Sequence, residues 1–549
     1  MVEVYYTIRP GKNIGDFAKL VSTTMKEYLQ PTRGFAILMA IGLWLSIVGI
    51  WSYPLLEPDE AKHALIVRAM LEGSFWMPYL NGEPFFDKPI LPFALMAVFA
   101  KFLGMNEFAL RLPGALLGFA SVIVLYRFVL RLRGDAEAFW AGFVWTTSPL
   151  FLAASHIPTH DIYLAFFSIL STFAGFRLLT EQGTPTESRF LGVGFWLGLA
   201  GGVLSKGLLG IVLPGIALLG PALVERQYLK AAAKRFLRIE GIACFLLLVL
   251  PWYAYVLVVY PEFGPSFLVR QHMGNFLGSL PRHPEPFWYY LPLLFGVFFP
   301  WAFFLPFIPF AWRPERKDRA FVALCASQGL GIFLFFSVAA SKLPLYILPA
   351  LPGFCMAFAP FLVKNAPARE RHLKILLGFI AVVFLAAIPY GLVFAKSAYP
   401  GFFRPAVVLS ALMTPVLLVA LLFSWRGTVG WLKGYVVFGL VFLYTLGFLC
   451  VTPLVGSYGS SKAAVQRLEQ SAPEDAVVLC YRRNCLSAQF YLGRPVKRVE
   501  HLDRNMLVPS RPLYVLVKKK YLTPFLAEAR PLGIKVEFRS EGFWLIRVG

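Results

Sequence analysis

The sequence predicts a polytopic α-helical membrane protein with about 13 transmembrane helices and a small C-terminal α/β domain. Of its 549 residues, 58% are hydrophobic and only 15% are charged, and the mean hydropathy is +0.65. Long apolar runs recur as far as Val451, and the composition beyond that residue is typical of a soluble domain. A soluble fold has no means of burying this much apolar surface, so we expect a lipid bilayer to cover it.

Thirteen runs are long enough to cross the roughly 30 Å hydrocarbon layer of a bilayer. These runs are Phe35 to Tyr53, then 112–130, 139–153, 162–179, 190–204, 208–223, 241–259, 287–310, 320–340, 343–363, 375–394, 406–423 and 435–451. The run from Ile90 to Leu103 spans only about 21 Å as a helix and has prolines at its start. We expect it to dip into the membrane without crossing.

The positions of the basic residues predict how the chain is oriented. In the thirteen-span arrangement Arg131, Arg133 and the segments 226–238, 313–319 and 364–374 lie on the same side as the N-terminus. Cytoplasmic loops are rich in Lys and Arg, so that side is the cytoplasm. This rule also explains the formal net charge of +22 without nucleic acid. No removable signal peptide is recognisable, and the first span reads as a signal anchor.

The orientation divides the chain into three parts. Residues 1–34 form a cytoplasmic segment, and residues 35–453 form the membrane domain, with outer loops at 54–111 and 260–286. Residues 457–549 form the soluble domain, on the periplasmic side. Strands are expected at Ala476–Tyr481, Leu513–Val517, Ile534–Arg539 and Phe543–Val548, and helices near Ala463–Gln470 and Tyr521–Ala529.

Two cysteines, Cys480 and Cys485, fall within this domain. In an oxidising compartment they can form a disulfide, and two free thiols are the alternative. The sequence leaves open whether the domain binds an acceptor or only supports the fold.

Basic residues also occur on the outer side, where they are expected to be rare. They are Lys88, Lys206, Arg270, Arg282 and Lys342. Either an anion holds them there, or they are solvated loop residues that extend from helix ends toward the interface. Lys206 and Lys342 favour the first reading, because each follows a serine at the end of an apolar span, where it can face a phosphate at the membrane surface.

Acidic residues collect on the same side. Glu57, Asp59 and Glu60 follow the first span, Asp87 lies in the same outer loop, and Asp161 begins a later span. A carboxylate within the membrane costs about 2.5–3.5 kcal/mol on insertion scales, so such a group usually pairs with cations or has a function. The alternative for Glu57 and Glu60 is capping of the helix that begins near residue 61.

The second outer loop contains Arg270, His272 and Asn275 and leads into the aromatic run Phe287 to Tyr290. The simplest interpretation of that run is an interfacial aromatic belt. Such a belt can also cover a lipid substrate.

An ordered series of motifs resembles the aminoarabinose-transferase-like family of GT-C glycosyltransferases. The series consists of Glu57-Pro58-Asp59-Glu60-Ala61, Asn81-Gly82-Glu83-Pro84, Phe86-Asp87-Lys88-Pro89, Asn106-Glu107-Phe108, Arg111-Leu112-Pro113, Ser205-Lys206-Gly207, Pro251-Trp252-Tyr253, Trp288-Tyr289-Tyr290 and Ser341-Lys342-Leu343-Pro344-Leu345-Tyr346. The resemblance covers most of the chain. It implies a GT-C fold in the bacterial inner membrane and an inverting transfer of a sugar from polyprenyl phosphate at the periplasmic face.

The resemblance also assigns roles to residues. It implies that Asp59 is catalytic, that Asp161 supports it, and that Lys88, Lys342 and Tyr346 engage the carrier phosphate. The full set of candidate substrate-binding residues is Glu60, Lys88, Lys206, Arg270, Lys342 and Tyr346.

The chemistry of glycosyl transfer agrees with these roles. Positive charge develops on the anomeric carbon and negative charge on the departing phosphate, so cations are needed beside the leaving group. A hydroxyl acceptor needs a general base, for which Asp59 is the candidate. If the acceptor is a lipid A phosphate, the nucleophile is already anionic and Asp59 would orient it.

The chain departs from the family at two positions. It has Asp87 where relatives commonly have Glu, and Asn275 where they commonly have Arg. In the family the acidic position and the His272 position can hold zinc, and carboxylate and imidazole are suitable ligands. With two ligands visible, we expect no required cofactor and treat a zinc site at Asp87 and His272 as a secondary hypothesis. Arg270 or Arg282 can replace the missing arginine.

The expected donor is aminoarabinose, or a related pentose or hexuronic acid, on polyprenyl phosphate. The expected acceptor is lipid A or another envelope component, and the chain is expected to be a monomer in contact with membrane lipids. Two alternatives are a transferase that delivers another sugar to a glycan or protein hydroxyl, and a lipid or polysaccharide transporter. Transporters often have internal repeats and midplane polar groups, whereas here the polar groups lie at the outer rim.

Overall fold

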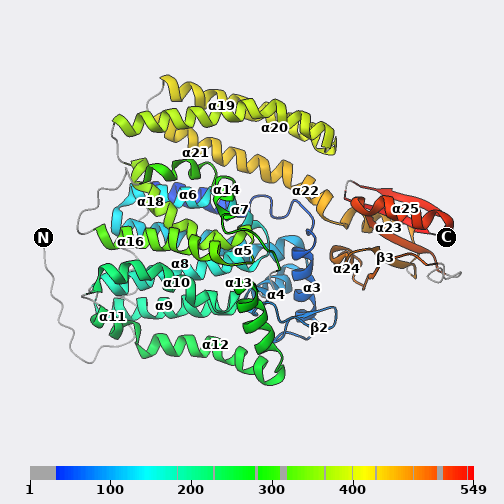
Figure 1. Cartoon of the computed structure of the whole chain (residues 1–549), viewed down its shortest axis with the longest axis horizontal. Helices are drawn as coiled ribbons and strands as arrows, with labels where there is room; N and C mark the ends of the chain where they lie inside the picture. The colour runs from blue at the N-terminus through cyan, green and yellow to red at the C-terminus, as the bar shows by residue number, and fades with distance from the viewer. Residues whose placement is uncertain are drawn as a thin grey trace.

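The computed structural model is a bundle of long helices with a small sheet domain beyond one end. Figure 1 shows the bundle helices running side by side, with the C-terminal domain next to the short helices at that end. The structure describes residues 33–181, 184–226, 229–278, 282–308, 318–363, 367–398, 400–426, 429–473, 475–503, 511–540 and 542–548.

Seven helical segments in the described ranges are long and apolar enough to cross a membrane. They are Glu107–Arg133, His160–Thr180, Pro185–Lys206, Ile239–Val259, Arg319–Val338, Pro344–Val363 and Lys433–Gly459. Five shorter apolar helical stretches accompany them, at Arg33–Ile47, Leu91–Leu103, Leu209–Val224, Leu377–Tyr390 and Ala406–Leu422. The prediction of a multi-pass helical membrane protein is confirmed, although length and composition alone identify fewer crossings than the thirteen expected.

The bundle contains the following helices. They are α2 (Arg33–Ile47), α5 (Glu107–Arg133), α6 (Asp135–Thr146), α7 (Pro149–His156), α8 (His160–Thr180), α9 (Pro185–Lys206), α10 (Leu209–Val224), α11 (Leu229–Phe236), α12 (Ile239–Val259), α14 (Tyr290–Val297), η3 (Trp301–Phe307), α16 (Arg319–Ala326), η5 (Ser327–Gly331), α17 (Ile332–Val338), η6 (Pro344–Ala350), α18 (Leu351–Val363), α19 (Pro367–Ala398), α20 (Pro400–Arg426), α21 (Val429–Leu446), η7 (Gly447–Val451) and α22 (Thr452–Gly459).

Prolines interrupt two of the predicted spans. The run 139–153 divides into α6 and α7, and Pro149 begins the second helix. The run 287–310 divides into α14 and the 3₁₀ helix η3, with Pro300 between them. Proline has no N–H to continue a helix and disfavours helical geometry in the residue before it. Apolar composition alone does not reveal these breaks.

Helices α8 and α9 pack closely because α9 presents glycine at their contact. A Cβ atom on Gly198 would lie only 2.6 Å from the backbone nitrogen of Ser171. Small residues at such positions let two membrane helices approach and gain van der Waals contact. This packing matters for the site, since α8 begins at His160 and α9 ends at Lys206.

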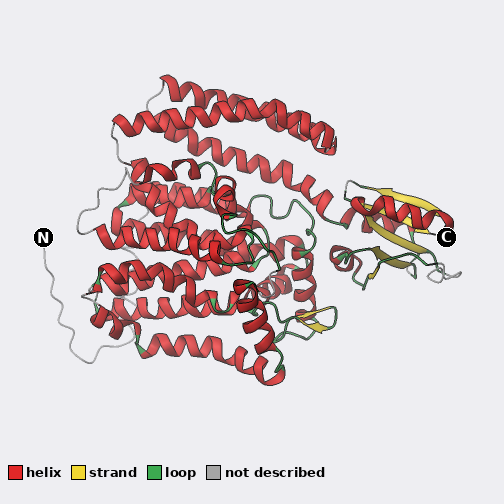
Figure 2. Cartoon of the chain, viewed as in Figure 1, coloured by secondary structure: helices red, strands yellow, loops and turns green. Residues whose placement is uncertain are grey.

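Short elements gather at the end of the bundle that faces the C-terminal domain. They are α3 (Asp59–Leu71), the hairpin β1 (Tyr79–Leu80) and β2 (Glu83–Pro84), α4 (Leu91–Leu103), the π-helix η2 (Pro265–Gly274) and α13 (Asn275–Leu277). Figures 1 and 2 place α3, α4 and the hairpin at this end. Helix α4 has 13 residues, fewer than the ~20 that a crossing requires.

The C-terminal domain is a five-stranded mixed sheet with helices. Its strand order is β4-β3-β5-β7-β6, with β3 parallel to β4 and β5, and β7 antiparallel to β5 and β6. The elements are α23 (Lys462–Ser471), β3 (Val477–Tyr481), α24 (Leu486–Leu492), β4 (Lys497–Val499), β5 (Leu513–Lys518), η9 (Lys519–Tyr521), α25 (Leu522–Ala529), η10 (Arg530–Leu532), β6 (Ile534–Arg539) and β7 (Phe543–Val548).

All four predicted strands and both predicted helices of this domain are confirmed. Strand β4 and helix α24 were not predicted, because three and seven residues are too few to show a clear periodicity. Of the two possibilities left open for the cysteines, the structure has Cys480 joined to Cys485 in a disulfide.

Candidate functional site

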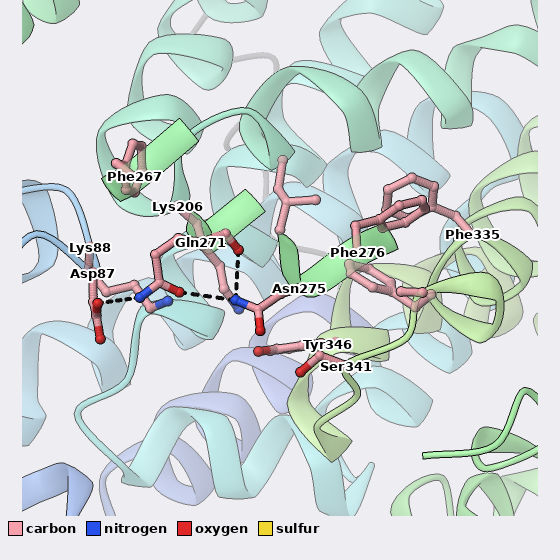
Figure 3. Close-up of a pocket in the computed structure, with 13 residues that line it drawn as sticks. Asp87, Lys88, Lys206, Phe267, Gln271, Asn275, Phe276, Phe335, Ser341 and Tyr346 are labelled. Carbon is pink, nitrogen blue, oxygen red and sulfur yellow. Dashed lines mark hydrogen bonds between the residues drawn. The ribbon is translucent and has the colours of Figure 1, made fainter. Parts of the chain in front are cut away.

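A cavity of about 100 Å³ lies where the outer loops meet the ends of the bundle helices. It is smaller than the ~300–1,000 Å³ of a typical small-molecule pocket, so its size suits the phosphate end of a larger ligand. It is lined by Asp87, Lys88, Lys206, Leu209, Phe267, Gln271, Asn275, Phe276, Phe335, Phe336, Ala339, Ser341 and Tyr346. Figure 3 shows the polar side chains of Asp87, Gln271 and Asn275 in one row and the rings of Phe276 and Phe335 beyond them.

Two lysines from distant parts of the sequence line this cavity. Lys88 lies in the loop between β2 and α4, whereas Lys206 is the last residue of α9. The next residue, Gly207, has φ of 65°, and this left-handed conformation, which glycine adopts readily, turns the chain into α10. The fold therefore brings Lys88 and Lys206, two of the candidate substrate-binding residues, to the same cavity.

Asp161 and Tyr346 hold the Lys206 side chain. The Lys206 Nζ atom lies 2.5 Å from Asp161 Oδ1 and 4.4 Å from the centre of the Tyr346 ring. Both members of the ion pair are buried, with side chains 8% and 12% exposed. A buried pair of this kind fixes the direction of the ammonium group, so Asp161 acts on the pocket through Lys206.

Among the described residues, no carboxylate is in contact with the Lys88 ammonium. Burial and the positive charge of Lys206 lower its pKa to about 8, against the opposing effect of the Asp87 and Asp161 carboxylates. Lys88 is therefore mostly charged at pH 7. It loses its charge at a pH more than two units below that of an exposed lysine. A bound phosphate would stabilise the charged form.

Asp59 lies at the start of α3 and outside the cavity lining. Its side chain is 62% exposed, and its Oδ1 atom accepts a 2.6 Å hydrogen bond from Lys62. Partial burial would raise the pKa of Asp59, but the Lys62 ammonium outweighs this effect and lowers it, with smaller contributions from His63 and His283. Asp59 is therefore an ionised carboxylate that an acceptor can reach.

Glu60 differs from the prediction that it binds substrate. Both of its oxygens accept hydrogen bonds from Arg111, at 2.9 and 2.8 Å, and the side chain is 2% exposed. Arg111 also donates to the carbonyls of Ile50, Tyr53 and Pro54. The structure thus gives Glu60 a structural role, in which the pair holds the loop before α3.

The metal hypothesis fails a test of fit at Asp87. The Arg282 guanidinium donates to both Asp87 oxygens, at 2.6 and 3.1 Å, and the Gln271 amide donates to one of them. Arg282 therefore occupies the place beside Asp87 that a zinc ion would need. The His272 side chain lies outside the described residues, and those that are described bring no three His, Cys, Asp or Glu side chains together.

The same ion pair connects the two outer loops. Burial would raise the pKa of the Asp87 carboxyl, but its hydrogen bond and charge interaction with Arg282 hold that pKa below its usual value. Gln271 links the pair to Asn275, whose amide donates to the Gln271 carbonyl at 2.9 Å (Figure 3). The ion pair of Asp87 with Arg282 thus continues through Gln271 to Asn275.

Two other predicted cations lie outside the cavity lining. The buried Lys342 ammonium donates to the backbone carbonyl of Glu285 at 2.7 Å and to that of Ala339 at 2.5 Å. Its neighbour Ser341 lines the cavity in its place. Arg270 is exposed on η2, and the adjacent Gln271 faces the cavity.

Two histidines lie buried among the elements that carry the site. The His63 Nδ1 atom is 2.5 Å from the Pro158 carbonyl, and its ring lies 5.1 Å from that of His160 and 5.2 Å from that of Phe93. Burial lowers the pKa of His63 to about 4, so its ring is neutral at pH 7. The rings join α3 to α4 and α8 and set the orientation of Asp59 on its helix.

Several cavity residues were not among the predicted site residues, namely Leu209, Phe267, Gln271, Phe276, Phe335, Phe336, Ala339 and Ser341. The phenylalanines have no distinguishing signal in a chain that contains 53 of them. Gln271 had one available signal, because it lies in the polar segment that supplied Arg270 and Asn275.

Comparisons with known proteins show which proteins this chain resembles. Residues 87–255 match the family described as dolichyl-phosphate-mannose-protein mannosyltransferase. The chain is 29% identical over 380 residues to an undecaprenyl phosphate-alpha-4-amino-4-deoxy-L-arabinose arabinosyl transferase of Proteus mirabilis, and the match covers 66% of each chain. It is 30% identical over 367 residues to the corresponding transferase of Pseudomonas aeruginosa, over 64% of each chain. The chain thus spans slightly under two thirds of the length of these relatives.

The structural comparison extends over nearly the whole chain. The crystal structure of ArnT from Cupriavidus metallidurans bound to undecaprenyl phosphate aligns with a TM-score of 0.78 and 25% sequence identity, over 94% of this chain and 98% of that one. The apo structure of the same protein aligns with a TM-score of 0.76. The resemblance to the aminoarabinose-transferase-like family is confirmed. Like the chains of this family, the protein is a multi-pass helical membrane protein with a C-terminal sheet domain.

Proposed function

We propose that this protein is an inverting glycosyltransferase that takes a sugar from a polyprenyl phosphate donor and transfers it to a cell-envelope acceptor. The similar proteins differ in the sugars that their names give, mannose in one case and aminoarabinose in the other. Both names specify a sugar on a long-chain polyprenol phosphate. The donor class is therefore the feature that the comparisons support best.

The observation that carries the proposal is the convergence of Lys88 and Lys206 on one small cavity. Burial and the repulsion between two like charges both lower the pKa of Lys88. An anionic ligand relieves that repulsion. The phosphate of a lipid carrier has the charge and the position, at the end of the membrane helices, to do so.

The reaction follows from the positions of these groups. The acceptor oxygen attacks the anomeric carbon, the bond between that carbon and the phosphate oxygen breaks, and its electron pair stays on the carrier phosphate. Lys88 and Lys206 stabilise the negative charge that develops there. Asp59 accepts the proton of a hydroxyl acceptor, or orients an acceptor that is already anionic. Asp161 keeps Lys206 in position, and the Tyr346 ring packs against its ammonium group.

We assign the remaining predicted residues more limited parts. Arg270 is exposed on the outer loop, where it can meet the sugar or the acceptor as these approach. Lys342 supports the cavity through its carbonyl contacts and adds positive potential behind Ser341.

The proposed donor sugar is aminoarabinose or a related pentose or hexuronic acid, and the proposed acceptor is lipid A or another envelope lipid. The relatives' names support this choice. The proposed arrangement has thirteen spans in a bacterial inner membrane, with the cavity and the C-terminal domain in the periplasm. The basic residues of α11, at the opposite end of the bundle in Figure 1, support this orientation. A monomer suffices, since the cavity is built from one chain.

We also propose that transfer requires no metal ion. Arg282 already neutralises the Asp87 carboxylate that would have bound one. Incubation with a chelator, followed by its removal, is expected to leave the transfer rate unchanged. A rate that falls and is restored by zinc would overturn this part of the proposal.

The function can be tested with purified protein and a panel of polyprenyl phosphate donors that carry labelled sugars. Wild type is expected to transfer one sugar to lipid A, and Asp59→Asn is expected to lower the rate by about 100-fold or more. Ser471→Ala, a change at an exposed position of α23, is the matched control. Equal transfer by wild type and Asp59→Asn would refute the role of Asp59, and no transfer from any donor would refute the donor class.

A further inference from the structure

The C-terminal domain contacts the segment that leads into α3, through the first turn of α24. The Ser487 backbone N–H and hydroxyl both donate to Glu57 Oε1, each at 2.6 Å. The Glu57 side chain is 1% exposed, and Ser487 is fully buried. Ser461 adds a further bond, with its hydroxyl 2.7 Å from that of Ser487. This is a buried polar contact between residues 430 positions apart in the sequence.

The same helix holds neighbouring parts of the outer loop. The Tyr491 hydroxyl accepts a 2.8 Å hydrogen bond from the Leu55 N–H and donates a 2.9 Å bond to Glu107. Arg68 of α3 donates to the carbonyl of Phe490 at 2.7 Å. Helix α24 is therefore bonded both to the segment before α3 and to α3 itself, and Figure 1 shows α24 beside α3.

Helix α22 approaches the same segment from another direction. The Glu57 N–H donates to the carbonyl of Gly459 at 2.9 Å. Cβ atoms on Gly456 and Gly459 would lie 2.5 Å from Pro54 and 2.8 Å from Leu56. Only glycine permits so close an approach. The backbone of residues 54–57 is thus fixed from the C-terminal side as tightly as Arg111 fixes it from the bundle.

The disulfide lies directly behind this contact. Cys485 precedes α24 and stands two residues before Ser487, and it is joined to Cys480 in β3. Both sulfur-bearing residues are fully buried. The covalent bond attaches the start of α24 to the central part of the sheet, so that Ser487 faces Glu57 from a rigid support.

We propose that Ser487 is a positioning residue for Asp59. It acts through Glu57, which lies two residues before Asp59 on the same chain segment, and the Cys480–Cys485 disulfide keeps Ser487 in place. The C-terminal domain is then part of the catalytic apparatus, although none of its described residues line the cavity. This inference rests on the proposed catalytic role of Asp59.

The contact has an energetic reason to be specific. Glu57 is a buried carboxylate whose nearest cation, Arg483, lies 3.7 Å from its Oε2 atom. A buried charge must be well hydrogen-bonded to be tolerated, and Ser487 supplies both bonds to Oε1. Without the Ser487 hydroxyl, Glu57 Oε1 loses one of its two hydrogen bonds and the side chain can shift. A shift of Glu57 also moves Asp59, two residues later in the chain.

The first test is steady-state kinetics of Ser487→Ala in the full-length protein. We expect kcat to fall about tenfold, the size of effect that a charge-assisted hydrogen bond has, while the KM for the polyprenyl phosphate donor stays unchanged. The donor KM is insensitive because Lys88 lies before α4 and Lys206 ends α9, so neither belongs to the segment that Glu57 holds. Ser487→Thr retains the hydroxyl and is expected to restore kcat to within about twofold.

Matched variants separate this inference from the proposed function. Ser471→Ala removes a serine hydroxyl from an exposed site of the same domain and is expected to have no effect. If Asp59→Asn is inactive and Ser487→Ala has the kcat of wild type, the inference is wrong but the proposed function stands. If Asp59→Asn is fully active, the proposed function itself fails.

Two further variants test the proposal even if Ser487→Ala does not fold, and one of them tests the disulfide. Glu57→Gln removes the charge from the other partner, and combined with Ser487→Ala it is expected to lower kcat no further than either change alone. The double variant Cys480→Ser, Cys485→Ser is expected to lower kcat with unchanged donor KM. If the double variant of Glu57 and Ser487 lowers kcat by the product of the two single effects, Ser487 does not act through Glu57. If the variant without the disulfide has the kcat of wild type, the disulfide does not keep Ser487 in place.

Discussion

At the scale of single residues, the site depends on two lysines whose charges are held close together. Lys206 has Asp161 as an ion-pair partner, whereas no carboxylate of the described residues is in contact with Lys88 in the same cavity. Burial and the charge of Lys206 lower the pKa of Lys88 to about 8.

A pH dependence follows from this value. The pKa is lowered, so the charged form that binds phosphate is present below about pH 8 and is lost above it. We therefore expect kcat/KM for the donor to be level near pH 7 and to fall about tenfold per unit well above pH 8, because kcat/KM reports groups of the free enzyme. Lys88→Arg keeps its charge over this range and is expected to abolish the fall. An unchanged profile in Lys88→Arg would assign the titration to another group.

At the scale of elements, the loop that enters α3 is held by a buried ion pair. Arg111 and Glu60 have side chains 0% and 2% exposed, and Arg111 also binds three backbone carbonyls. Removal of one partner leaves the other charge buried and uncompensated. The pair is therefore costly to break, whatever its net contribution to stability.

A stability measurement tests this role. Arg111→Met is expected to lower the free energy of unfolding in detergent by about 3–5 kcal/mol. Arg189 pairs with Glu240 at the surface, with 56% and 30% of their side chains exposed, and Arg189→Met is expected to cost less than about 1 kcal/mol. Combining Arg111→Met with Glu60→Gln should recover part of the loss. Equal, small effects of the two arginine variants would contradict the structural assignment.

At this scale the sequence predicted the elements that have a local pattern. It did not predict ion pairs between residues that are far apart in the chain. The alternating strands β6 and β7 and the Ser205-Lys206 end of α9 are local patterns, and they lie where expected. The pair of Asp87 with Arg282 joins positions 195 apart. No local periodicity reports such a contact, so the sequence alone does not show that Asp87 pairs with Arg282 or that Glu60 pairs with Arg111.

At the scale of the whole molecule, the polar chemistry and the C-terminal domain lie at one end of the helix bundle. Helix α11 lies at the other end, as Figure 1 shows. In the proposed orientation the first end is periplasmic and the second is cytoplasmic. This orientation depends on how many times the chain crosses the membrane. The side of the membrane on which each end lies can be tested without measuring activity.

Labelling with a membrane-impermeant thiol reagent provides that test. Glu72→Cys, at the exposed end of α3, is expected to react in intact cells with a permeable outer membrane, whereas Lys230→Cys in α11 is expected to react only in inverted vesicles. The exposed free cysteine Cys450 is changed to Ala in both variants. Reaction of both positions from the same side would refute the proposed topology.

The most direct measurement for the account as a whole is the binding of undecaprenyl phosphate to the purified protein. The account predicts that Lys88→Met weakens binding at least about tenfold, the loss expected for one charge-assisted contact. It predicts a similar loss for Lys206→Met combined with Asp161→Asn, a pairing that leaves no buried carboxylate unmatched. Arg189→Met should bind as wild type does. Wild-type affinity in both lysine variants would contradict the claim that this cavity holds the carrier phosphate.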